Sequence, residues 1–128
     1  MPRPSILIVD DNIEVIDALR TPVTRHVPSA LFLLHESQSS DALVSEIAAR
    51  HPSSVFLDAN LSGGIRGFDL VSSIRRLDPD IRCVGFSSDD GLAERFLQAG
   101  ADGFIHKDMG DVQGTVGRVV DFLNRMHE

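Results

Sequence analysis

The chain has 128 residues, of which 42% are apolar and 24% charged, and it carries a formal charge of −7. This length suffices for one domain with its own hydrophobic core, so we expect residues 1–128 to form a single domain. The negative charge argues against nucleic-acid binding by this chain alone, because phosphate contacts need clustered Lys and Arg.

No apolar run approaches the ~20 residues of a membrane span, and the N-terminus lacks the pattern of a signal peptide. The single cysteine, Cys83, cannot form an intramolecular disulfide, and it lies in an apolar run that indicates a buried, reduced thiol. We therefore expect a cytoplasmic protein that does not contact a membrane.

Five short apolar runs recur along the chain and predict β-strands. They contain consecutive apolar residues rather than an apolar–polar alternation, which is typical of strands covered on both faces of a sheet. The predicted strands are residues 5–10, 30–35, 55–58, 82–87 and 103–107.

The segments that follow these runs carry apolar residues at the spacing of a helix face. In chain order, the five sets are Ile13, Ile16, Leu19 and Val23; Leu43, Val44, Ile47 and Ala48; Phe68, Val71 and Ile74; Leu92, Ala93, Phe96 and Leu97; and Val112, Val116, Val119, Leu123 and Met126. Ser39 or Ser40 can begin the second helix, and Gly100 can end the fourth. Pro22 lies inside the first pattern and should kink that helix or end it early.

Alternating strands and helices predict an α/β fold, with a parallel sheet and helices on both of its faces. In such sheets ligands bind beyond the carboxyl ends of the strands, where the strand order reverses. Asp10 and Asp11 follow the first strand and Asp58 ends the third, while Ser87 and Lys107 end the last two. If the strand order is 2-1-3-4-5, the first and third strands are neighbours and their three carboxylates converge.

A cluster of carboxylates can bind a hard cation such as Mg²⁺, which prefers oxygen ligands. The cation can also neutralise a phosphoryl group and hold it in line for attack by one carboxylate oxygen. In this arrangement Asp58 is the nucleophile and forms an aspartyl phosphate. The ammonium of Lys107 pairs with the phosphoryl oxygens, and the hydroxyl of Ser87 donates a hydrogen bond to another.

The stretches ILIVDDN, VFLDANLSGG, VGFSS and AGADGFIHKD resemble the receiver domain of two-component response regulators, a family that includes the chemotaxis response regulator. The resemblance covers essentially the whole chain, with each motif at a predicted strand end. It implies a flavodoxin-like, doubly wound (βα)5 fold, with a five-stranded parallel sheet in the order 2-1-3-4-5.

The resemblance also implies a metal site. Asp10 and Asp11 match the acid pair that holds Mg²⁺, for which Mn²⁺ can substitute. Asp58 and the backbone carbonyl of Asn60 match the remaining protein ligands.

Further roles follow from the same resemblance. Asp58 matches the phosphoacceptor, Lys107 the lysine that pairs with the phosphoryl group, and Ser87 the switch hydroxyl. Phe104 matches the aromatic switch that turns inward on activation.

The implied function is that of a receiver in a two-component phosphorelay. A sensor histidine kinase or a histidine phosphotransfer protein donates the phosphoryl group. The chain catalyses only its own phosphorylation and dephosphorylation, and it acts as a monomer or weak dimer. It signals to an unknown downstream protein through the fourth helix, fifth strand and fifth helix, roughly residues 90–127.

Two loops depart from the pattern of the family. Receivers usually carry Met-Pro a few residues after the phosphoacceptor and Pro after the lysine, where this chain has Leu61-Ser62 and Asp108. A Lys-Pro bond is commonly cis in this fold, but a cis bond before Asp108 would cost ~3 kcal/mol, so we expect a trans bond. The loop SGGIRG is one residue longer than usual, and Gly63 and Gly64 add flexibility beside the acceptor.

Other interpretations of these residues remain open. Asp11 or Asp58 alone could cap a loop or helix, Ser87 could serve a turn, and Phe104 could be a fixed aromatic. The histidines show no metal-ligand spacing and are expected at the surface or beside strands; they are His26, His35, His51, His106 and His127.

Two other functions compete with the receiver. One is a receiver-like interaction module that is never phosphorylated. The other is a metal-dependent phosphohydrolase on the same kind of sheet. Such enzymes use a second acid two residues after the nucleophile, and Asn60 in that position argues against this class.

Overall fold

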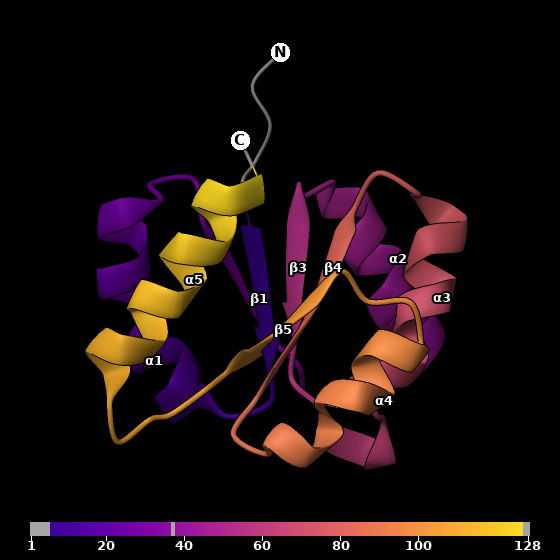
Figure 1. The fold of residues 1–128 in the computed structure, drawn as a ribbon. Helices are drawn as coiled ribbons and strands as arrows, with labels where there is room; N and C mark the ends of the chain where they lie inside the picture. The colour runs from indigo at the N-terminus through magenta and orange to yellow at the C-terminus, as the bar shows by residue number, and fades with distance from the viewer. Residues whose placement is uncertain (1–5, 37, 127–128) are drawn as a thin grey trace.

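The five apolar runs form one parallel sheet in the order β2-β1-β3-β4-β5, as the resemblance implied. The computed structural model describes residues 6–36 and 38–126 (Figure 1). The strands are β1 (Ile6–Asp10), β2 (Leu31–Leu34), β3 (Ser54–Leu57), β4 (Arg82–Ser87) and β5 (Gly103–His106). The strand order reverses between β1 and β3, which makes their carboxyl ends neighbours.

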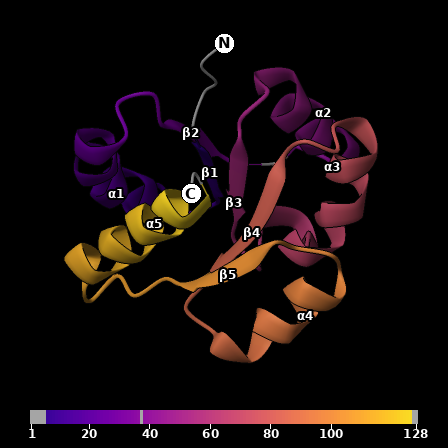
Figure 2. The ribbon, with the colours of Figure 1, turned by 45° about the horizontal axis from the view of Figure 1, so that its top comes forward.

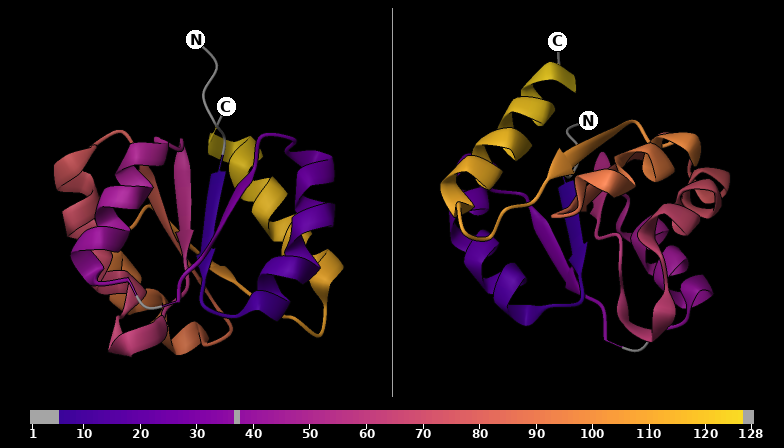
Figure 3. Two further views of the ribbon diagram at one scale, coloured as in Figure 1. Left: turned by 180° about the vertical axis from the view of Figure 1, so that it is seen from behind. Right: turned by 60° about the horizontal axis from the view of Figure 1, so that its bottom comes forward.

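In the described residues, five α-helices cover the sheet on both faces, as Figures 2 and 3 show for their arrangement. They are α1 (Ile13–His26), α2 (Ser40–Arg50), α3 (Val71–Leu77), α4 (Ala93–Gln98) and α5 (Val112–Met126). Helices α1 and α5 pack on one face, and α2, α3 and α4 pack on the other. Short 3-10 turns precede α3 and α4 at Gly67–Leu70 and Asp90–Leu92, and another, Ser62–Gly64, lies in the loop after β3. No helix in the described part of the chain is both long and apolar enough to cross a bilayer.

The core is divided into two layers by the sheet. Successive strand residues point to opposite faces, so Leu7 and Val9 pack under α2 and α3, whereas Ile6 and Ile8 pack under α1 and α5. Both layers exclude water, which explains why the strands contain consecutive apolar residues. Cys83 is free and buried in the first layer, as expected.

Several helix ends follow from local chemistry. The side chain of Asn12 accepts a hydrogen bond from the Glu14 amide and caps α1. The side chain of Ser39 accepts one from the Ala42 amide and caps α2. Gly100 adopts a φ of +100° just after α4, which a residue with a side chain rarely adopts.

The early end expected at Pro22 was wrong, because α1 continues through this residue to His26, while the alternative of a kink stays a prediction. A proline removes the hydrogen bond to the residue four positions earlier, here Ala18. Ala18 is exposed, so water can satisfy its carbonyl group. Val23 is fully buried, and this packing favours continuing the helix for another turn.

Two apolar positions also differ from the sequence pattern. Ile13 was assigned to the apolar face of the first helix, but it is 48% exposed. Leu97 was assigned to the buried face of the fourth helix, but it is 53% exposed, because α4 has only six residues and Phe96 alone fills the core there. Among the histidines, His35 lies beside a strand as expected, since it directly follows β2, and it is fully buried. His127 lies outside the described residues.

Gly67 provides a test of how tightly the loop after β3 packs. A Cβ atom at this position would lie 2.0 Å from the carbonyl oxygen of Asp58, which is backbone and cannot move aside easily. Gly67→Ala should therefore lower the free energy of unfolding by about 2 kcal/mol. Urea unfolding followed by circular dichroism measures this, since the chain has no Trp or Tyr.

Gly117→Ala is the matched control, because a Cβ atom there meets nothing within 4 Å. Gly117 lies inside α5, so alanine should raise the stability by up to ~1 kcal/mol. Equal stability of Gly67→Ala and the parent protein would contradict the packing described for this loop.

Candidate functional site

Three carboxylates meet where β1 and β3 end side by side. Val9 pairs with Leu57 in the sheet, so Asp10 and Asp58, the next residues, emerge together at the carboxyl edge. One carboxylate oxygen from each of Asp10, Asp11 and Asp58 lies within 4.8 Å of the others. The convergence expected from the strand order is thus present.

The ammonium group of Lys107 lies inside this cluster. Its Nζ is 2.7 Å from Asp10 Oδ2 and 3.3 Å from Asp58 Oδ1. The side chains of Lys107 and Asp10 are only 8% and 1% exposed, so water screens their attraction weakly. Lys107 Nζ also lies 5.5 Å from the ring centroid of Phe86.

The environment of Asp58 opposes its ionisation in the protein alone. Burial raises the pKa of its carboxyl group to about 6, and the charges of Asp10 and Asp11 add to the rise, while Lys107 lowers it. Desolvation and like charges both disfavour the carboxylate form. A bound cation would offset both effects, so this donor set fits a hard divalent ion such as Mg²⁺.

The backbone at Asn60 is available to such an ion. Asn60 and Arg66 form an isolated antiparallel bridge, in which the Leu61 amide donates to Ile65 and the Gly67 amide to Ala59. In this pairing the amide and carbonyl of Asn60 itself point away from Arg66. The carbonyl oxygen is thus free of the bridge and lies in the segment beside Asp58, and its place as a ligand stays a prediction.

The unusual loop after Asp58 is closed at its base rather than open. The Asn60–Arg66 bridge ties its two ends, and a guanidinium nitrogen of Arg66 donates to Asn60 Oδ1 at 3.1 Å. Gly63 and Gly64 adopt φ values of +76° and +77°, so both glycines are required by the turn itself. The role of Arg66 was missed in the sequence, because it depends on how the loop closes.

The loop also reaches the carboxylate cluster. Ser62 Oγ donates a hydrogen bond to Asp11 Oδ2 at 3.4 Å. The residue that replaces the usual proline therefore has a polar contact with one of the three acids.

Ser87 lies at the end of β4 and lines the same cleft as Asp10, Asp58 and Lys107. It is 4% exposed, and its hydroxyl accepts a hydrogen bond from the Asp89 amide at 3.1 Å. That contact leaves the hydroxyl proton available to another acceptor.

Phe104 is held elsewhere, on the face of the sheet covered by α4. Its ring centroid is 5.9 Å from that of Phe96, and Gly85 leaves room for both rings, since a Cβ atom there would lie within 2.8 Å of each. Phe104 is half-buried and is not among the residues that line the cleft. Its predicted movement stays a prediction.

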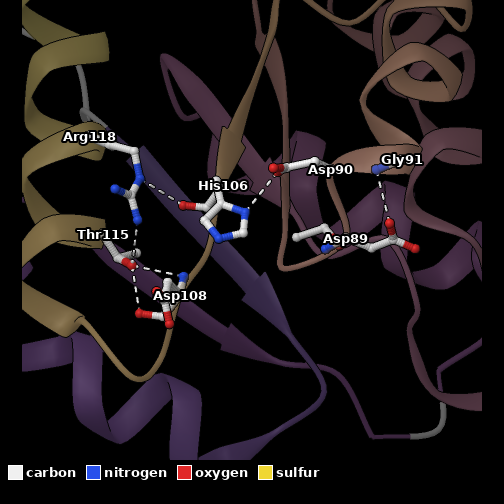
Figure 4. A network of polar contacts seen from close by, with 8 residues as sticks. Asp89, Asp90, Gly91, His106, Asp108, Thr115 and Arg118 are labelled. Atoms are coloured by element: carbon white, nitrogen blue, oxygen red, sulfur yellow. Dashed lines mark hydrogen bonds and ion pairs between the residues drawn. The ribbon is translucent and has the colours of Figure 1, made fainter.

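Two further features lie at the end of β5 and in the segment that follows it. The Lys107–Asp108 bond is trans as expected, since the described residues contain no cis peptide bond. His106 Nδ1 lies 2.7 Å from Asp90 Oδ1, which links β5 to the loop after β4 (Figure 4). No pattern in the sequence predicts this contact, because it joins residues 16 positions apart.

Residues 6–115 match the family described as response regulator receiver domain. The chain belongs to this family. Response regulator GacA of Pseudomonas viridiflava is 29% identical over 109 residues, which cover 82% of this chain and 49% of GacA. The chain thus spans about half the length of this curated relative.

Solved receiver structures share the fold. A two-component response regulator from Clostridium difficile superimposes with a TM-score of 0.73 at 20% identity, covering 98% of this chain and 100% of that one. The BeF3-activated receiver domain of DrrB gives a TM-score of 0.71 at 18% identity, covering 96% and 99%. These likenesses show the fold, and the family match shows a receiver domain of a two-component response regulator.

The raised pKa of Asp58 makes a prediction about stability and pH. Between pH 4 and 6 the folded protein retains a proton on Asp58 that the unfolded chain has released. Without metal, stability should therefore fall as the pH rises through this window, by about 3 kcal/mol from this group. Asp58→Asn should flatten that part of the curve, as measured by urea unfolding in EDTA from pH 4 to 7.5.

Asp121→Asn, at an exposed position of α5, is the control and should keep the slope of the parent protein. A parent curve without the fall, or the same fall in Asp58→Asn, would show that Asp58 is not the group responsible.

Proposed function

We propose that this receiver accepts a phosphoryl group on Asp58 in a Mg²⁺-dependent reaction and then changes its binding to a downstream protein. The observation that carries the proposal is the position of Lys107 Nζ, 2.7 Å from Asp10 and 3.3 Å from Asp58. The three converging carboxylates can bind a cation, and the ammonium group beside them can bind the transferred phosphoryl group. The donor is a sensor histidine kinase or a histidine phosphotransfer protein.

Each acidic residue has a defined part in the proposal. Asp10, Asp11, Asp58 and the Asn60 carbonyl would hold Mg²⁺ or Mn²⁺, and the bound ion would supply positive charge that neutralises the phosphoryl oxygens. A free oxygen of Asp58 attacks phosphorus and forms the new O–P bond. The bond from phosphorus to the donor breaks, and the donor keeps that electron pair.

The remaining polar groups stabilise the product. Lys107 moves its charge toward the phosphoryl oxygens, and the Ser87 hydroxyl turns its proton to another of them. Phe104 and the segment after Ser87 then adopt a new arrangement, and the face formed by α4, β5 and α5 changes partners. Residues 1–128 act as one receiver domain, in the cytoplasm and as a monomer or weak dimer, and its catalysis is limited to its own phosphorylation and dephosphorylation.

The direct test is phosphorylation by acetyl phosphate, read as the aspartyl phosphate on a phosphate-affinity gel. We expect modification that needs Mg²⁺ and disappears in Asp58→Asn. Asp69→Asn, at an exposed position near the acceptor in sequence, is the control and should be modified like the parent protein. Absence of modification together with absence of Mg²⁺ affinity would favour an interaction module that is never phosphorylated.

Lys107→Ala separates the metal site from the phosphoryl site. The variant should bind Mg²⁺, because the carboxylates remain, but it should lose the conformational response to beryllofluoride. Without metal it should be destabilised by about 3 kcal/mol, since Asp10 is left buried without its partner. Calorimetric titration gives the metal affinity, and amide NMR shifts give the response; a full response in this variant would contradict the role of Lys107.

A further inference from the structure

Lys107 depends on its backbone for its position. Its Nζ atom lies at the end of a flexible four-carbon stem, so the distance of Nζ from the carboxylates depends on the position of the Cα atom as well as on the side-chain torsions. The residue follows the end of β5, which is an edge strand with a neighbour on one side only. The sheet alone therefore fixes this residue on one side.

The peptide group before Lys107 is bound at both ends. Its amide donates to the Ser87 carbonyl at 2.9 Å, which continues the pairing with β4. Its carbonyl, which belongs to His106, points the opposite way and accepts from Arg118 Nε at 3.0 Å (Figure 4). Arg118 thus takes the place of the missing neighbouring strand.

The peptide group after Lys107 is held by Thr115. The amide of Asp108 donates to Thr115 Oγ1 at 2.9 Å, and the same hydroxyl donates back to the Asp108 carbonyl at 2.9 Å. Arg118 donates a further hydrogen bond to this hydroxyl at 3.3 Å. These contacts use the one proton and both lone pairs of the hydroxyl, and Thr115 is fully buried.

We infer that Thr115 and Arg118 are positioning residues for Lys107. Together they form a clamp from α5 that binds the peptide groups on both sides of the lysine. The inference rests on the proposed role of Lys107 at the phosphoryl group. Neither residue touches the carboxylates, so the clamp acts through the placement of Nζ.

The clamp also accounts for a departure from the family pattern. The proline usual after the lysine has no amide hydrogen, whereas Asp108 has one that must be satisfied. Thr115 supplies the acceptor for it. The trans Lys107–Asp108 bond is therefore compatible with a lysine that reaches both Asp10 and Asp58.

Lys107 is the only lysine of the chain, which allows a direct test. Protein labelled with ¹⁵N-lysine gives one side-chain ammonium signal, whose hydrogen exchange is slow when the ammonium is buried and paired. Thr115→Val and Arg118→Gln should speed this exchange about tenfold, the effect of losing roughly one hydrogen bond. Thr115→Ser keeps the hydroxyl, and Arg125→Gln makes the same charge change at an exposed position of α5; both should match the parent protein.

A second measurement separates positioning from general stability. The rate of Asp58 phosphorylation by acetyl phosphate should fall about tenfold in Thr115→Val and Arg118→Gln, while Mg²⁺ affinity is unchanged. In a Lys107→Ala background the same substitutions should have no further effect on this rate, because their target is absent. Additive losses in that background would overturn the inference, and so would parent-like ammonium exchange in both variants.

The two measurements fail in different ways. If the parent protein takes no phosphoryl group, the proposed function is wrong, but the ammonium exchange still tests the clamp. If the parent is phosphorylated and the variants show parent-like exchange and rates, the clamp is wrong and the proposed function stands. Should Thr115→Val fail to fold, Arg118→Gln alone carries both tests.

Discussion

The ion pair between Lys107 and Asp10 is the interaction on which the site depends. It joins residues 97 positions apart, with 2.7 Å between Nζ and Oδ2, in a place that water barely reaches. Two buried charges are costly unless their geometry is good, and here the ammonium also lies 3.3 Å from Asp58. The pair compensates part of the negative charge of three neighbouring carboxylates. What remains is a net negative cluster that suits a divalent cation.

Each part of the fold contributes to this arrangement for a physical reason. The reversal of strand order between β1 and β3 brings Asp10 and Asp58 together. The helices that cover both faces of the sheet exclude water from the strands that carry these residues. The loop after Asp58 is predicted to depart from the family pattern, yet the Asn60–Arg66 bridge closes it and leaves the Asn60 carbonyl turned away from the bridge. Changes of sequence at these loops are thus compensated by local hydrogen bonds. We expect the chemistry to tolerate them.

The sequence predicted those features that arise from periodicity and strand ends, and missed those that arise from long-range contacts. Consecutive apolar residues identified the strands, and acids at their ends located the cleft. An early end of the first helix at Pro22 was misjudged, because burial of Val23 outweighs the lost hydrogen bond. Leu97 was misjudged because α4 is too short for a full apolar face. The contacts of Thr115 with Asp108 depend on how α5 returns to β5, which no local pattern encodes.

The central claim is that the cluster at the carboxyl edge is one cation site beside Lys107. Mn²⁺ is paramagnetic and broadens NMR signals of nearby nuclei, so titration of ¹⁵N-labelled protein with Mn²⁺ tests the claim most directly. We expect the amides of Asp11, Asp58 and Asn60 to broaden first, at substoichiometric Mn²⁺, and excess Mg²⁺ to restore them. Amides at the opposite edge, such as that of Ser54, should broaden only at higher Mn²⁺ concentrations. The account would be contradicted if broadening began at other acidic surfaces and left the amides of Asp11, Asp58 and Asn60 sharp.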